Sequence, residues 1–277
     1  MSDSPPPAPT LATTPAVRSR WIERALSVGV QAHVWVALAA TSLSAFAAMQ
    51  LGLAFDVIDA QIVAVSTLVI YNLDSWVDGR RRLPRVALVA TAACGLGLGL
   101  FCSPLELSGV VLIGLAACTL YAIEIRGFVL KRLFPLKALF VASAVTVGVV
   151  AVPWIRHGGE VVTTTALATG LFLLGLVGTN VVIFDLRDHH EDRERRVPTF
   201  SVRWGRRRTV AVLVVAQWAW VPILAVLGFD LLPAVAVSLS YVLIVTRVRG
   251  VRDYRLDLLV DGVPVIVPWL ASGVMWS

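Results

Sequence analysis

Nine long, nearly uncharged apolar runs follow one another along this chain, and they restrict its fold more than any other feature. They cover residues 28–49, 57–73, 84–102, 105–123, 134–153, 163–185, 209–228, 229–247 and 257–276. Each run is near the twenty residues that an α-helix needs to cross the hydrocarbon core of a bilayer. Backbone groups in lipid must bond within their own segment, so the runs are predicted to be helices. Together with a mean hydropathy of +0.80, this predicts an all-α polytopic membrane protein with nine transmembrane helices.

The 24 lysines and arginines fall almost entirely on one side of these predicted helices. All but Arg156 lie in the N-terminal arm or in the second, fourth, sixth and eighth connections. By the positive-inside rule this side is cytoplasmic, which predicts a cytoplasmic N-terminus and a C-terminus outside. The arginine bias and the short connections predict a bacterial inner membrane.

The remaining composition bounds the domains and partners. Residues 1–16 lack the hydrophobicity to pack, so they are predicted to form a disordered N-terminal arm. Residues 17–277 are predicted to form a single transmembrane domain in the lipid bilayer. The net charge of +6 reflects the topology and an anionic ligand. No nucleic-acid partner is predicted, because the basic residues form no free soluble surface.

Two acidic motifs lie at predicted cytoplasmic helix ends. In YNLDSWVDGRRR, Asp74 and Asp78 are four residues apart and point the same way from a helix. In FDLRDHHEDRERR, Asp185, Asp188 and Asp192 fall at i, i+3 and i+7, which predicts one stripe. Four predicted helices separate the motifs, so the chain has two similar four-helix units plus one further helix.

The motif residues suggest a divalent-cation and phosphate site. Five carboxylates brought together without a cation would raise one another's pKa values. Oxygen ligands suit Mg²⁺, which also shares phosphate oxygens with its substrates. Arginines follow each motif, at 80–82 and 193–196, and are suited to hold a diphosphate by paired hydrogen bonds. The alternative is that these are solvated helix ends whose aspartates and arginines pair with each other. The repetition at equivalent points of both halves favours the site.

Five further residues are secondary candidates. Asp257 and Asp261 open the last run, and Asp261 lies about one turn inside it. Two roles remain open for this pair, facing the same cavity and pairing with an arginine at the helix end. Tyr71, Tyr121 and Asn180 are candidate cavity residues. Interface belts, helix packing and interhelical hydrogen bonds are the commoner roles of such side chains.

On these residues the chain resembles the UbiA superfamily of intramembrane prenyltransferases, from the first run to the last. The family has nine transmembrane helices and two cytoplasmic aspartate-rich motifs. Its second motif lies in a stretch such as NDIRDxxxDxxxGxxTxxxxxG. FDLRDHHEDRERRVPTFSVRWG is similar to it, except that Arg196 stands where glycine is usual. In the first motif, usually NxxxDxxxD, Ile70 takes the asparagine position and Asn72 lies two residues later.

The resemblance implies helices around a central cavity that opens near the cytoplasmic face, with Mg²⁺ as the cofactor. The implied catalytic residues are Asp74, Asp78, Asp185, Asp188 and Asp192. Of these, Asp185 orients or joins the metal ligands, which are Asp74, Asp78, Asp188, Asp192 and the less typical Asn72. KRLFPLKALF is similar to the basic stretch before the family's fifth helix, so Lys131 and Lys137 join Arg80 and Arg193 as diphosphate-binding candidates.

The implied activity is magnesium-dependent ionisation of a prenyl diphosphate, followed by transfer of the prenyl group to an aromatic or lipid acceptor. The alternative of the same fold is a terpene cyclase, in which the substrate's own double bonds capture the cation. A transporter is a different class of protein. It is disfavoured because transport sites lie near the midplane of inverted repeats, whereas these acids lie at one face.

Overall fold

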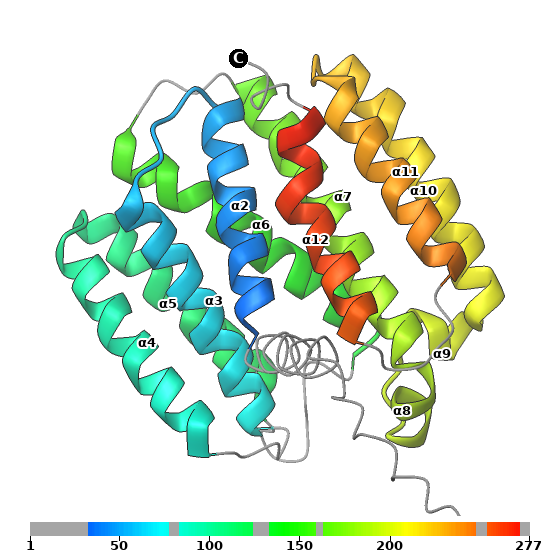
Figure 1. Ribbon diagram of the computed structural model, residues 1–277, viewed down its shortest axis with the longest axis horizontal. Coiled ribbons are helices and arrows are strands. Elements are labelled where there is room, and N and C mark those ends of the chain that lie inside the picture. The colour runs from blue at the N-terminus through cyan, green and yellow to red at the C-terminus, as the bar shows by residue number, and fades with distance from the viewer. Residues whose placement is uncertain (1–32, 78–82, 124–132, 159–162, 248–253, 272–277) are drawn as a thin grey trace, which may run out of the picture.

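A computed structural model describes residues 33–77, 83–123, 133–158, 163–247 and 254–271, all of whose elements are helical (Figure 1). The nine long helices among these residues are α2 Val34–Gln50, α3 Val57–Val77, α4 Leu83–Phe101, α5 Leu105–Ala122, α6 Leu136–His157, α7 Thr163–Arg187, α10 Arg206–Val226, α11 Leu231–Arg247 and α12 Tyr254–Ala271. Two short helices, α8 His189–Glu194 and α9 Phe200–Trp204, lie between α7 and α10. The all-α prediction is confirmed.

Five of the described helices are long and apolar enough to cross a membrane. Their candidate spans are Val57–Ser75, Leu105–Ala122, Leu136–His157, Thr164–Arg187 and Arg206–Val226. Shorter apolar helical stretches cover Val34–Gln50, Val89–Phe101 and Leu231–Arg247. The long helices coincide with the nine apolar runs of the sequence to within a few residues wherever both are described.

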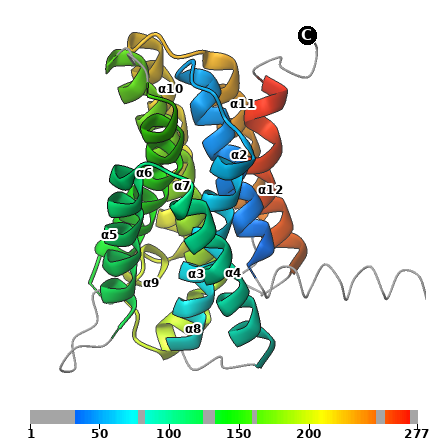
Figure 2. The same cartoon turned by 90° about the vertical axis from the view of Figure 1, so that its left-hand side faces the viewer.

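Consecutive long helices run in alternating directions along one common axis (Figures 1 and 2). As a result, α3 and α7 end where α6 and α12 begin, and α8 and α9 lie at this same end of the bundle. We call it the α8 end; it is the lower end in Figure 1. At the opposite end, α2 and α6 end and α3 begins. Both acidic motifs therefore belong to the α8 end.

The core runs through the helices that surround α2 and α7. Helix α2 packs against α3, α6, α7 and α12, and α7 also packs against α10 and α11. Phe46 and Phe172 contact each other with ring centroids 5.6 Å apart, and Phe172 stacks on Phe229 at 4.9 Å. Hydrogen bonds also cross between helices, such as Ser44 Oγ to the Val149 carbonyl at 2.7 Å. Bonds of this kind stabilise helix association where water is absent.

Large apolar side chains cover the outside of the bundle. Phe101 and Val226 are each 87% exposed, and Leu105 is 83% exposed. Apolar exposure over so many helices would favour aggregation in water. It suits contact with lipid tails instead, as the apolar runs predict.

Candidate active site

The second acidic motif is built by a break between two helices. Helix α7 ends at Arg187, and Asp188 is the residue that caps the start of α8. Asp185 therefore belongs to the last turn of α7 and Asp192 to α8, so the three aspartates do not form a stripe on one helix. Asp185 and Asp192 are both buried, with 2% and 8% of their surfaces exposed.

Two basic side chains neutralise part of this acidic group. Lys137, in the first turn of α6, donates from Nζ to Asp185 Oδ1 at 2.5 Å. Arg187 grips Asp188 with two hydrogen bonds, Nε to Oδ1 at 2.8 Å and Nη2 to Oδ2 at 2.6 Å. The third nitrogen, Nη1, donates to Asp257 Oδ1 on α12. Lys137 and Arg187 thus supply part of the positive charge that these three aspartates require.

Asp192 is the acid of this group with unfilled bonding capacity. Its Oδ2 atom is buried and has no hydrogen-bond partner among the described residues. The pKa of Asp192 is raised to about 6, mainly by burial and also by the charges of Asp185 and Asp188, while the charge of Lys137 acts to lower it. A hydrogen bond from Thr199 also lowers the pKa. A buried carboxylate oxygen without a donor is a position where a cation fits.

A small hydroxyl network fixes the segment after α8 to the end of α7. Ser201 Oγ donates to the backbone carbonyl of Asp185 at 2.9 Å, and it lies 3.2 Å from Thr199 Oγ1. His189 Nδ1 lies 3.3 Å from the same Ser201 hydroxyl. Burial is the main cause that lowers the pKa of His189, and His190 adds to it. These contacts give His189 a packing role at the turn.

The first motif borders a separate apolar cavity of about 420 Å³. Asp74, in the last turn of α3, lines this cavity together with Tyr71 and Tyr121. The rest of the lining is mainly apolar and comes largely from α3, α5 and α6. Tyr121 stacks on Phe140 with centroids 4.4 Å apart and ring planes at 8°. The cavity size is typical of a site for a small organic ligand.

Other predicted residues of the first motif lie away from this cavity or outside the described residues. Asn72 is buried, and its Nδ2 donates to the Leu68 carbonyl at 2.9 Å within the same helix. It does not line the cavity. Asp78, Arg80 and Lys131 fall outside the described residues.

Helix α12 contributes two acidic side chains that bond to α7, Asp257 and Asp261. Asp261 is 5% exposed and accepts a hydrogen bond from Asn180 Nδ2 on α7 at 3.3 Å. Asp257 pairs with an arginine, which is one of the two roles left open for this pair, whereas the bond of Asp261 is an interhelical hydrogen bond, which is neither of them.

The motif aspartates that the structure describes do not gather into one metal-binding group. Among the described residues, the one group of three or more metal-ligating atoms within 4.8 Å of one another is Asp56, Asp59 and His157. Lys137 and Arg187 stand between the carboxylates of the second motif instead.

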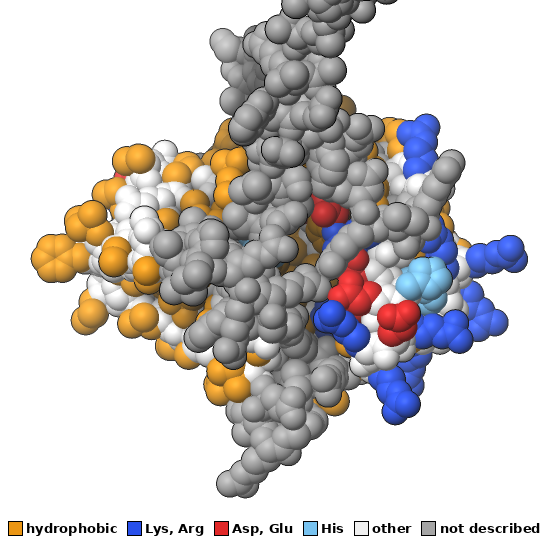
Figure 3. Space-filling model, turned by 60° about the horizontal axis from the view of Figure 1, so that its bottom comes forward, with side chains coloured by type: hydrophobic (Ala, Val, Ile, Leu, Met, Phe, Trp, Pro, Cys, Tyr) orange, Lys and Arg blue, Asp and Glu red, His pale blue; other side chains and the backbone are white. Residues whose placement is uncertain are grey.

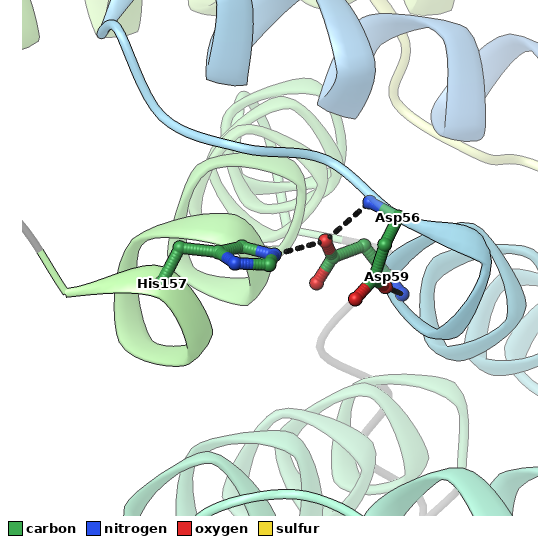
Figure 4. A group of neighbouring side chains, drawn as sticks. All are labelled: Asp56, Asp59 and His157. Carbon is green, nitrogen blue, oxygen red and sulfur yellow. Dashed lines mark hydrogen bonds and ion pairs between the residues drawn. The ribbon is translucent and has the colours of Figure 1, made fainter.

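The group of Asp56, Asp59 and His157 lies at the opposite end of the bundle, where α3 begins and α6 ends (Figure 4). Arg156 Nη1 donates to Asp56 Oδ1 at 2.6 Å and to Asp59 Oδ1 at 2.8 Å. His157 Nε2 lies 2.6 Å from Asp59 Oδ2. The hydrogen bond from Arg156 holds the pKa of Asp56 well below its usual range. These ion pairs tie α3 to α6 at the end of the bundle away from the α8 end.

The surface of the α8 end groups charged side chains beside an apolar region. Figure 3 shows acidic and histidine side chains on one side of this face, with lysines and arginines around them. Arg193 is exposed here, and Arg195 Nη2 pairs with Glu191 at 2.8 Å. The basic rim matches the anionic ligand that the sequence predicts.

Sequence reasoning assigned no role to Arg187 or Ser201. Arg187 stands between two aspartates at the end of an apolar run, which is a signal that it is buried and paired. Its partner Asp257 is 70 residues away along the chain, and only the fold reveals it. Ser201 carries no comparable signal.

Two comparisons with known proteins bear on this site. A search of curated proteins gave no match. The family model of the UbiA prenyltransferase family matches residues 76–258, about two thirds of the chain. The match begins two residues after Asp74, and it contains the whole second motif and Asp257. The chain therefore belongs to the UbiA prenyltransferase family.

Proposed function

We propose that this protein is a magnesium-dependent intramembrane prenyltransferase. It would ionise an isoprenoid diphosphate and transfer the prenyl group to an aromatic or lipid acceptor. The observation that carries the proposal is an apolar cavity with a carboxylate, Asp74, in its wall on the motif-bearing part of α3. An apolar chain ending in a diphosphate has the matching chemistry, since its tail avoids water and its head binds cations.

The proposal includes nine membrane-spanning helices, with the α8 end in the cytoplasm. Five described helices meet the length and apolarity of a span, and the remaining four long helices lie alongside them in one bundle (Figures 1 and 2). The distribution of lysine and arginine supports this orientation. A diphosphate made in the cytoplasm would then reach the acidic motifs directly.

Mg²⁺ would be held by Asp74, Asp78, Asp188 and Asp192, with Asn72 the least supported of these candidates. The observation that fits a cation is the buried Oδ2 of Asp192, which has no hydrogen-bond partner in the part of the chain that the structure describes. When bound, Mg²⁺ stabilises the charge that grows on a departing diphosphate. A hard cation of this kind prefers the carboxylate oxygens that the two motifs offer.

Basic side chains would hold the diphosphate beside these carboxylates. Lys137 is placed by its bond to Asp185 and sits between α6 and α7. In this role Asp185 orients the ammonium group, which stabilises negative charge on the leaving group in a largely water-free site. Arg193 on α8 is exposed and supplies a further contact, and Arg80 and Lys131 are proposed from the sequence alone.

The fate of the prenyl cation separates two activities of one fold. Transfer to an acceptor is our leading proposal, by analogy with the family. The stacked rings of Tyr121 and Phe140 in the cavity wall favour the alternative, a terpene cyclase, because aromatic faces stabilise a cation held inside a cavity.

Product analysis tests the proposal. Purified protein in detergent is given Mg²⁺ and geranyl, farnesyl or geranylgeranyl diphosphate, first alone and then with a lipid or aromatic extract. We expect a prenylated product only when the extract is present. Cyclic hydrocarbon from the diphosphate alone would establish the cyclase instead, and no product in either arm would refute both activities.

A further inference from the structure

The strongest unexplained feature is a three-residue chain that links α12 to the second acidic motif. Arg187 bonds Asp188 through two nitrogens and Asp257 through the third. The side chains are largely buried, with 10% of Arg187, 21% of Asp188 and 14% of Asp257 exposed. Asp257 lies outside both aspartate-rich motifs, in the first turn of α12.

The geometry fixes Arg187 on every side. Its guanidinium carbon lies 4.7 Å from the centroid of the Phe184 ring, and its three nitrogens all have carboxylate partners. A planar guanidinium held in this way presents a rigid fork to Asp188. Asp188 stands at the N-cap position of α8, where its side chain makes no capping hydrogen bond. Its orientation is therefore set by Arg187.

Charge accounts for the presence of Asp257. A buried arginine next to Asp188 alone would cancel the negative charge that a divalent cation needs. Asp257 neutralises Arg187, so the three side chains together keep one negative charge. Each oxygen of Asp188 accepts one bond from Arg187, Oδ1 from Nε and Oδ2 from Nη2.

We infer that Asp257 is a positioning residue for divalent-cation binding, which acts by holding Arg187 so that Arg187 orients Asp188. The inference rests on the proposed function, because it requires Asp188 to bind the ion. Partners that orient a ligating carboxylate typically contribute about 10–100-fold to metal affinity. Helix α12 would then be a third part of the site, besides the two motifs.

The test measures Mn²⁺ binding by the full-length protein in detergent, from the electron paramagnetic resonance signal of free Mn²⁺. Asp188→Asn removes the ligand itself and should abolish the tight site. Asp257→Asn should weaken Mn²⁺ binding about 10–100-fold. Asp230→Asn is the matched control, since Asp230 is exposed near the start of α11 and its Oδ1 bonds only a local backbone nitrogen in this structure.

A double variant, Arg187→Gln with Asp257→Asn, separates positioning from net charge. It removes one positive and one negative charge together, so the three side chains keep a net charge of one negative, now carried by Asp188 without its arginine. We expect binding about 10-fold weaker than that of the unaltered protein, because Asp188 is no longer oriented. Binding as tight as in the unaltered protein would overturn the inference.

The outcomes distinguish this inference from the proposed function. If the unaltered protein binds Mn²⁺ through Asp188 and the Asp257 variants bind equally well, only the positioning role fails. If the unaltered protein binds no Mn²⁺, the magnesium site itself is wrong and the positioning role falls with it.

Discussion

At the scale of single residues, the acids of the second motif differ in how their charge is met. Asp185 has Lys137, and Asp188 has Arg187. Asp192 has a buried oxygen that finds no hydrogen-bond partner among the described residues, and its pKa is about 6. A bound cation would therefore stabilise Asp192 more than the other two aspartates. In its absence, the ionised form of Asp192 should lower the stability of the fold.

Asp192→Asn should stabilise the metal-free protein at neutral pH. The folded-state pKa of about 6 lies above the ordinary value of 3.8, so ionisation of Asp192 opposes folding. This penalty is fully present above pH 6 and disappears as the pH falls toward 4. We expect the melting temperature in detergent with EDTA to rise by at least about 2 °C at pH 7.5, and by less at pH 5.

Magnesium provides the control for this prediction. A ligand that binds only the folded state stabilises it, so Mg²⁺ should raise the melting temperature of the unaltered protein more than that of Asp192→Asn. An equal effect of pH on both proteins would show that Asp192 is not the group responsible.

The sequence predicted these acids but not their partners. The spacing of Asp185, Asp188 and Asp192 is visible in one line of sequence, whereas Lys137 and Asp257 are brought to them by α6 and α12. Lys137 became a candidate only by resemblance to a family. Contacts between distant segments depend on how the helices pack, and no local pattern encodes that.

At the scale of elements, the turn after α8 shows why the family usually has glycine at the position of Arg196. Arg196 stands where glycine is usual, and its backbone φ is +56°. That left-handed conformation costs a side-chain-bearing residue about 1–2 kcal/mol, while glycine adopts it freely. The usual glycine therefore has a physical reason, and this chain carries the cost of replacing it.

Arg196→Gly should accordingly stabilise the protein by about 1 kcal/mol, since it removes this strain. Thermal unfolding in detergent measures the change. Arg195→Gly is the matched control, because Arg195 is also exposed but has an ordinary right-handed backbone and should gain nothing. Equal shifts for the two variants would contradict the strain at Arg196.

Close packing of α7 and α10 depends on a single glycine. A Cβ atom added at Gly175 would overlap the indole ring of Trp220. Gly175→Ala should therefore destabilise the protein by about 1–3 kcal/mol, because the ring must move in a packed helix interface. Gly170→Ala on the same helix meets nothing within 4 Å and should leave the melting temperature unchanged or raise it. A harmless Gly175→Ala would disprove the close approach.

The long helices were predictable from sequence, and the short ones were not. The run at 163–185 corresponds to α7 Thr163–Arg187. An apolar run of this length is enough to predict a membrane-spanning helix. Helices α8 and α9 are short and α8 is wholly polar, so neither has the repeating apolar pattern from which a helix is predicted. Their positions depend on contacts such as that of Ser201 with the end of α7.

At the scale of the whole molecule, orientation in the membrane is the prediction to check. In a variant without native cysteines, Asp230→Cys should react with a membrane-impermeant thiol reagent in intact cells, because it lies at the end opposite the motifs. Arg195→Cys, at the exposed surface of the α8 end, should react only after the cells are opened. The reverse pattern would place the acidic motifs outside the cell.

The whole-molecule account joins two halves of the chain in one site. Asp74 borders an apolar cavity, Lys137 on α6 bonds Asp185 of the second motif, and Asp261 on α12 accepts a hydrogen bond from Asn180. The central claim is that these parts act together on a prenyl diphosphate.

Pyrophosphate release is the measurement that tests this claim most directly. Purified protein is incubated with Mg²⁺, a prenyl diphosphate and a lipid or aromatic extract, and compared with Asp74→Asn, Asp188→Asn and a reaction containing EDTA. The account predicts release by the unaltered protein and its loss, by at least about 100-fold, in both variants and with EDTA. Release that persists in either variant would contradict a single site built from both motifs.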